Sequence, residues 1–260
     1  MKRKKWVALG CLCAAILCGG IGAYKYIQEK QAGETYEKLK EEVVEEEPQK
    51  TEPKETEHKK EEASAGVDIP IDFATLQQKN PDVYAWITIP QTAVDYPILQ
   101  HSTDNGYYLN HTIDGEEKQE GAIYTENYNT KTFEDPNTVI YGHDMKNGTM
   151  FQSLHNYMDR SFFDANRDLT IYMPNQILHY KIFAAYLYDD RHLMMHYNFW
   201  NPEDYQQYLD SIFSIRDMNA FIDTSMGVDH EDKIITLSTC YAGNSAQRYL
   251  VQAVLVSIEK

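Results

Sequence analysis

Three side chains in this sequence have the types and spacing of a covalent reaction centre. Cys240 ends the apolar run IITLSTC, His143 ends the apolar run TVIYGH, and Arg248 opens a further apolar run eight positions after Cys240. A thiolate is a strong nucleophile, an imidazole carries protons near neutral pH, and a guanidinium is a permanently charged donor that can hold a negative oxygen. Together these groups would suit attack on a carbonyl carbon.

A single cysteine is open to other interpretations. Cys240 could be a small buried residue, a disulfide partner or a metal ligand as well as a nucleophile. Two buried strands that each end in a reactive side chain favour the nucleophile, since strands hold such groups in a fixed geometry. The other cysteines, Cys11, Cys13 and Cys18, all lie in the apolar N-terminal segment. The rest of the chain therefore offers Cys240 no disulfide partner.

Metal binding is not favoured by the histidines. His192 and His196 in HLMMH have the four-residue spacing of a zinc-binding helix, but Leu193 stands where a metalloprotease has its general-base glutamate. The remaining histidines are scattered, and there is no glycine loop of the kind that binds phosphate. We therefore predict no metal and no cofactor.

The N-terminal region predicts a membrane anchor. Residues 1–5 contain four basic side chains, and an uncharged stretch follows from Trp6 to Tyr24. A helix of about 19 residues at ~1.5 Å each matches the ~30 Å hydrocarbon core of a bilayer. A cleaved signal peptide is the alternative. Because a basic flank stays inside the cell, we predict a cytoplasmic N-terminus over 1–5, an anchor over 6–27, and a single-pass protein of the cell membrane with its catalytic part on the extracellular face.

Residues 28–66 predict an acidic, disordered linker. This stretch consists of Glu, Lys, Thr, Gln and Pro with almost no aromatic residues, a composition that cannot bury enough apolar surface to fold. Its segment 34–47 has the Glu/Lys pairs of a transient helix. The folded part would cover 67–260, close to one domain in size. The net charge of the chain, −16, argues against nucleic acid as a partner.

The pattern of short apolar runs predicts a mainly β domain. The run YAWITIP alternates as in a half-buried strand, whereas NTVIYGH and KIITLST have the continuous apolar character of buried strands. Many short strands with few helices between them favour a closed or nearly closed barrel. The predicted strands cover residues 84–90, 94–100, 121–126, 137–143, two segments within 168–189 joined at Pro174–Gln176, 233–239 and 248–259.

Two helices are specified by their ends. Asp72 can cap the helix FATLQQKN, which Pro81 would terminate. Asn201 can cap a second helix that has Pro202 at its first position and two acids in its first turn. The segment NGTMFQSLHNYMD predicts a turn followed by a helix. The second helix has an apolar stripe at helical spacing, formed by Tyr205, Tyr208, Leu209, Ile212 and Phe213.

These motifs together resemble the sortases, the membrane-anchored cysteine transpeptidases of Gram-positive bacteria. TLSTC with a later arginine, and YGH upstream of it, are similar to the reactive motifs of that family. The fit is to class B, whose members carry a long helix between the sixth and seventh strands, where 201–213 would fall. The resemblance covers about residues 72–258. It implies an eight-stranded sortase-type β-barrel with an N-terminal helix and an inserted helix between late strands.

The resemblance also implies a reaction. Cys240 would attack a backbone carbonyl in the C-terminal sorting motif of a secreted protein and form a thioester. His143 would transfer protons, and Arg248 would stabilise the oxyanion or position the substrate. The protein would then pass to an amine of a cell-wall peptidoglycan precursor (a lipid II stem or cross-bridge) or, alternatively, to a lysine of a pilin subunit. The residues expected to bind substrate are Ser238, Tyr141 and Asn110.

Other classes of protein fit less well. A papain-like peptidase places its cysteine before its histidine, and an L,D-transpeptidase expects an SHGC-like segment that TLSTCYAG lacks. A non-catalytic surface binding module with an incidental thiol would leave the convergence of Cys, His and Arg unexplained. The preferred sorting motif (NPQTN-, LPXTG- or SPXTG/PPXTG-like) stays open.

Overall fold

The computed structural model describes residues 33–44, 67–241 and 244–260. The segments predicted as a cytoplasmic N-terminus and an anchor, 1–5 and 6–27, lie outside the described residues. Of the helices within the described ranges, none is both long and apolar enough to cross a membrane. Helix α5 (Pro202–Phe213), for example, has 12 residues and buries only one face. The predicted location, a single-pass protein of the cell membrane, is therefore contradicted.

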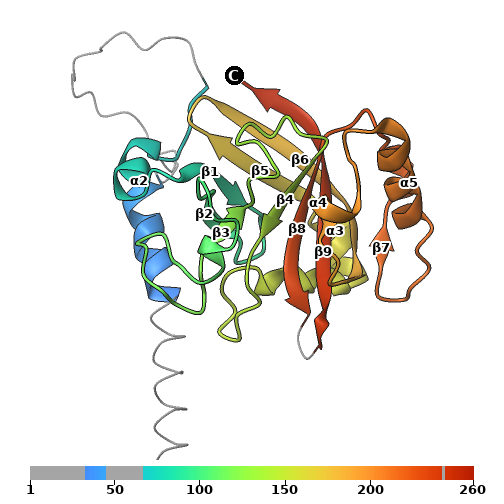
Figure 1. Cartoon of the computed structure of the whole chain (residues 1–260), viewed down its shortest axis with the longest axis horizontal. Coiled ribbons are helices and arrows are strands. Elements are labelled where there is room, and N and C mark those ends of the chain that lie inside the picture. Colours follow the sequence, from blue (N-terminus) through green and yellow to red (C-terminus); the bar gives the residue numbers. More distant parts are fainter. Residues whose placement is uncertain (1–32, 45–66, 242–243) are drawn as a thin grey trace, which may run out of the picture.

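In the part of the chain that the structure describes, one sheet contains β1 (Val83–Thr88), β2 (Asp95–Leu99), β3 (Ile123–Thr125), β4 (Asn137–Tyr141), β5 (Asp168–Met173), β6 (Gln176–Asp189), β7 (Phe221–Ile222), β8 (Ile234–Tyr241) and β9 (Asn244–Glu259). Eight of these strands close into the predicted barrel in the order β5-β1-β2-β3-β4-β8-β9-β6, because β6 also pairs with β5 (Figure 1). The short strand β7 pairs with the second half of β6, outside the ring. The pairs β2–β3 and β4–β8 are parallel.

Strand β1 is more buried than its sequence pattern predicts. Five of its six residues are buried, where alternation had indicated a half-buried strand. The reason is that helix α2 (Phe73–Lys79) packs against β1 and covers it. As predicted, Asp72 caps α2, its carboxylate accepting from the Thr75 N–H at 3.0 Å. Helix α2 is thus the N-terminal helix of the predicted fold.

The remaining helices lie in the connections between strands. Asn201 caps α5 as predicted, accepting from two backbone N–H groups of the first turn, and the apolar stripe of α5 packs against β6, β8 and β9 in a second core cluster. In Figure 1, α5 and β7 lie on the side of the barrel opposite α2. The segment predicted as a helix after a turn is a 3-10 helix, η2 (Gln152–Met158). The others are α3 (Arg160–Ala165), α4 (Leu193–His196), η1 (Tyr107–Leu109) and η3 (Thr224–Met226).

Part of the predicted disordered linker is ordered. Within 28–66, residues 33–43 form a helix that packs beside α2 (Figure 1). The Tyr36 hydroxyl donates to the Gly121 carbonyl at 2.9 Å. Its apolar residues have the i, i+3, i+7 spacing of one helix face, but charged residues stand between them in the sequence. The buried face of this helix consists of Tyr36, Leu39 and Val43.

Low pH should weaken the contacts of one carboxylate that stabilises the fold. Asp223, at the start of η3, accepts from the Ser225 hydroxyl at 2.5 Å and pairs with Arg167 at 2.5 Å. The Ser225 hydrogen bond and the Arg167 charge lower the pKa of Asp223 from 3.8 to about 2. Because the folded-state pKa lies below the unfolded value, this contribution is present above pH 4 and is lost as the pH falls through about 2.

We expect Asp223→Asn to lower the free energy of unfolding by about 1 kcal/mol at pH 7 and by much less at pH 2. Urea unfolding at the two pH values measures this difference. Asp68→Asn, at an exposed position, is the matched control and should have no effect at either pH. An equal loss at pH 7 and pH 2 would contradict the role of the charge.

Candidate active site

Strands β4, β8 and β9 lie side by side and bring together the three residues predicted to carry the reaction. β4 and β8 are parallel, with Tyr141 opposite Ser238. Continuing this register by two residues places His143 beside Cys240. β8 and β9 are antiparallel, and Cys240 is paired directly with Arg248. The strand ends thus position an imidazole, a thiol and a guanidinium at one edge, and these three residues are called the triad below.

Gly142 fixes the path of the chain into this edge. Its N–H donates to the Ser238 carbonyl at 3.1 Å and so extends the parallel ladder by one bond. A Cβ atom on Gly142 would lie 2.5 Å from Ile123 and 2.7 Å from Phe151. Both neighbours are fully buried, so a larger residue would displace the backbone that carries His143.

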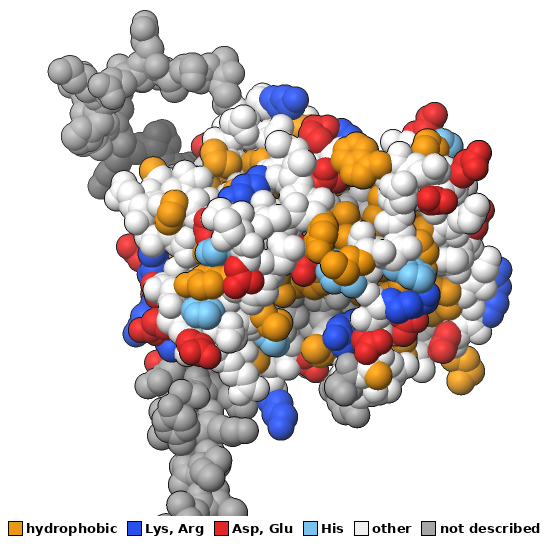
Figure 2. Space-filling view, viewed as in Figure 1, with side chains coloured by type: hydrophobic (Ala, Val, Ile, Leu, Met, Phe, Trp, Pro, Cys, Tyr) orange, Lys and Arg blue, Asp and Glu red, His pale blue; other side chains and the backbone are white. Residues whose placement is uncertain are grey.

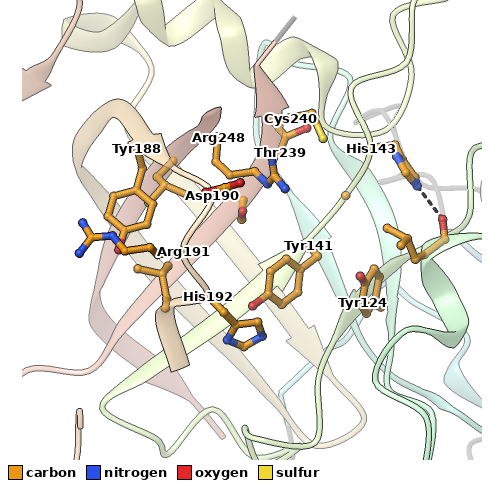
Figure 3. A pocket seen from close by; sticks show the side chains of 15 residues that line it. Tyr124, Tyr141, His143, Tyr188, Asp190, Arg191, His192, Thr239, Cys240 and Arg248 are labelled. Carbon is orange, nitrogen blue, oxygen red and sulfur yellow. Dashed lines mark hydrogen bonds between the residues drawn. The ribbon is translucent and has the colours of Figure 1, made fainter. Parts of the chain in front are cut away.

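A pocket of about 220 Å³ opens at the triad (Figure 3). All three triad residues line it, with Cys240 between His143 and Arg248 in the view of Figure 3. Of the residues predicted to bind substrate, Tyr141 and Ser238 line the pocket. Asn110 is not among the described residues that line it. Hydrophobic side chains, histidines and basic side chains gather near the middle of the face shown in Figure 2.

His143 is held by a backbone carbonyl. Its Nε2 donates to the Leu109 carbonyl at 2.6 Å, which leaves Nδ1 for proton exchange (Figure 3). Leu109 ends η1, directly before the predicted residue Asn110. The Asn110 side chain instead accepts from His111 Nδ1 at 3.0 Å. Nothing in the sequence pointed to this partner of His143, because every residue has a main-chain carbonyl whatever its side chain.

A hydrogen bond between His192 and Glu126 lies at the opposite end of the pocket. His192 Nε2 lies 2.6 Å from the Glu126 carboxylate, which joins the segment after β6 to the segment after β3. Burial, with the negative charge of Glu126, raises the pKa of Tyr141 and of Tyr124 well above the usual value. The Tyr141 hydroxyl also donates a hydrogen bond to the Glu126 carboxylate, which ties Tyr141 to this end of the pocket.

Sequence reasoning missed this end of the pocket. The sequence singled out His192 only as one of two histidines at a zinc-binding spacing. In the structure His192 pairs with the Glu126 carboxylate and not with His196. Among the described residues, no group of three or more His, Cys, Asp or Glu side chains is placed to hold a metal ion. The pairing joins residues 66 positions apart, which no local motif could reveal.

The thiol of Cys240 is exposed to solvent, so the buried-residue interpretation of this cysteine fails. An exposed thiol with an imidazole and a guanidinium lining the same pocket, at the rim of a closed barrel, is the arrangement that a cysteine nucleophile would need.

Known proteins share both the sequence and the fold. The sortase domain family matches residues 87–256. Sortase B of Listeria monocytogenes is 35% identical over 184 residues, which are 70% of this chain and 73% of that protein. The structure of Clostridium perfringens sortase B has a TM-score of 0.65 and 31% identity, covering 72% of this chain and all of that one. The chain therefore belongs to the sortase family, in class B, and is a cysteine transpeptidase.

Proposed function

We propose that this enzyme cleaves a C-terminal sorting motif of secreted proteins through a thioester on Cys240 and transfers the protein to an amine of a peptidoglycan precursor. The observation that carries the proposal is that Cys240 pairs with Arg248 across β8 and β9 and that both line one pocket with His143. A substrate complex of Staphylococcus aureus sortase B, with a TM-score of 0.66 and 27% identity over 89% of this chain and 99% of that one, supports peptide binding.

In the first half-reaction, the Cys240 thiolate adds to the scissile carbonyl carbon, and the electron pair of the carbonyl π bond moves to the oxygen. Arg248 stabilises this oxyanion as a charged donor. When the carbon–nitrogen bond breaks, the imidazolium of His143 protonates the departing amine. The products are an acyl thioester on Cys240 and the free C-terminal tail of the substrate.

In the second half-reaction, an amine attacks the thioester carbonyl and gives a proton to His143. Collapse of the tetrahedral intermediate forms the new amide bond and releases the Cys240 thiolate, which restores the starting state. Polar groups on the pocket wall, including the hydroxyls of Ser238 and Tyr141, would hold the backbone of the peptide in reach of the thiol.

The test uses the full chain, because helix 33–43 packs onto the barrel. We would incubate it with quenched peptides of the NPQTN, LPXTG and SPXTG/PPXTG types, alone and with either an α-amine peptide or a lysine side-chain amine. We expect cleavage of one motif, a thioester mass on the peptide that contains Cys240, and a transpeptidation product with the α-amine. Preference for the lysine amine would favour pilin polymerisation, and failure to acylate Cys240 with any motif would contradict the proposal.

A further inference from the structure

The residue that follows each member of the triad lies behind the pocket and approaches one histidine, His155. Successive side chains of a strand point to opposite faces, so residues after the triad turn away from the pocket. The Asp144 carboxylate lies 3.7 Å from His155 Nδ1. The rings of Tyr249 and Tyr241 lie 5.3 and 6.1 Å from the imidazole, centre to centre. One imidazole therefore meets the neighbours of all three reactive residues.

His155 is itself fixed in place. It lies in η2, and its Nδ1 is 3.1 Å from the Gln152 carbonyl. Because a carbonyl only accepts, Nδ1 carries its hydrogen whether the ring is neutral or charged. The Asp144 carboxylate faces this same N–H, and both side chains are only 14% exposed. The contact thus joins η2 to the residue that follows His143.

The cluster around His155 is not built for stability alone. Thr239 and Tyr249 pair across β8 and β9. A buried polar atom without a partner costs free energy, and such costs are tolerated where a site needs the group. Three atoms here are buried and have no hydrogen-bond partner among the described residues: His155 Nε2, Tyr249 Oη and Thr239 Oγ1.

The backbone ladder gives little support where the triad begins. The last pair of β4 and β8 is Tyr141 with Ser238, two residues before His143 and Cys240. The register of β8 and β9 becomes irregular directly after Cys240. The ladder pairs Cys240 with Arg248, but His143 lies beyond the Gly142–Ser238 hydrogen bond that ends it between β4 and β8. A contact from outside the ladder is therefore needed to fix His143 relative to the other two.

We infer that His155 is a positioning residue for the cysteine reaction: by contacting the residue after each triad member, it fixes the separation of the thiol, the imidazole and the guanidinium. The inference rests on the proposed roles of the triad. His155 does not line the pocket, so it acts through its neighbours and not on the substrate. Small displacements of reacting groups lower rates strongly, since the productive geometry is narrow.

The test compares His155→Leu with His155→Asn, whose amide can keep the donor at the Nδ1 position. We expect His155→Leu to lower kcat for peptide cleavage by about tenfold or more, with KM changed by less than about twofold. We expect it also to slow alkylation of Cys240 by iodoacetamide, followed by mass spectrometry of the Cys240 peptide. His155→Asn should keep at least about half of both rates. Alkylation needs no peptide, so it separates this inference from the proposed function.

His179→Leu is the matched control, because His179 also pairs with a carboxylate, Glu259 at 2.7 Å, but at the far end of β6 and β9. It should leave both rates unchanged. If His155→Leu does not fold, Asp144→Asn takes its place and should slow alkylation in the same direction. Unchanged rates in the folded variant, a loss confined to KM, or equal losses in His155→Leu and His155→Asn would overturn the inference.

Discussion

Replacement of Cys240 by alanine is expected to reduce kcat/KM for sorting-motif peptides by about 10³-fold or more, because it removes the covalent route. The thiol is exposed at the pocket rim, so its loss leaves no cavity in the core. The midpoint of thermal unfolding should therefore stay within about 1 °C of that of the unmodified enzyme. Initial-rate kinetics and a thermal melt of the same preparation measure the two quantities.

Cys240→Ser is the matched control for this prediction. Its hydroxyl has nearly the volume of the thiol, but it is far less acidic and a poorer nucleophile at neutral pH. We expect it to be almost as inactive as the alanine variant and to bind peptide with a Kd within about threefold of the unmodified enzyme. Cleavage by Cys240→Ala within tenfold of the unmodified rate would exclude the thioester mechanism and mean that another group carries the cleavage.

The strands that carry the triad could be predicted from the sequence because each is a continuous apolar run that stops at a reactive residue. Runs of this kind indicate a strand buried on both faces, and such a strand has one polar end where the core stops. What the runs cannot show is that β4 and β8 are parallel neighbours, since the two are far apart in the chain. The resemblance to a known family implied that the two strand ends serve one site, and the parallel pairing of β4 and β8 comes from the structure.

Two parts of the molecule escaped sequence reasoning for different reasons. Helix 33–43 has few apolar residues among many charges, and it is ordered because the barrel offers a surface that buries its one apolar stripe. That surface is tertiary, so composition alone predicted disorder. The partner of His143 escaped because it is the main-chain carbonyl of Leu109, and a carbonyl is present in every residue whatever its type.

Replacement of Arg248 by alanine is expected to lower kcat for peptide cleavage by about 10² to 10³-fold, the range found when an oxyanion donor is removed. Arg248 is paired across the ladder with Cys240, and both side chains line one pocket, so the proposed role puts the guanidinium within reach of a carbonyl bound at the thiol. An oxyanion exists only in the tetrahedral intermediates. The loss should therefore appear in kcat, with KM changed by less than about threefold. Steady-state kinetics with the preferred motif measure the split.

Two comparisons separate oxyanion stabilisation from substrate positioning. Arg248→Lys keeps the charge but not the planar fork of donors. We therefore expect its kcat to be about tenfold higher than that of Arg248→Ala, and no higher. Alkylation of Cys240 by iodoacetamide passes through no oxyanion, so Arg248→Ala should slow it far less than it slows peptide cleavage. A loss that appears mainly in KM would instead assign Arg248 to substrate binding, and equal losses in cleavage and alkylation would mean that it acts on the thiol.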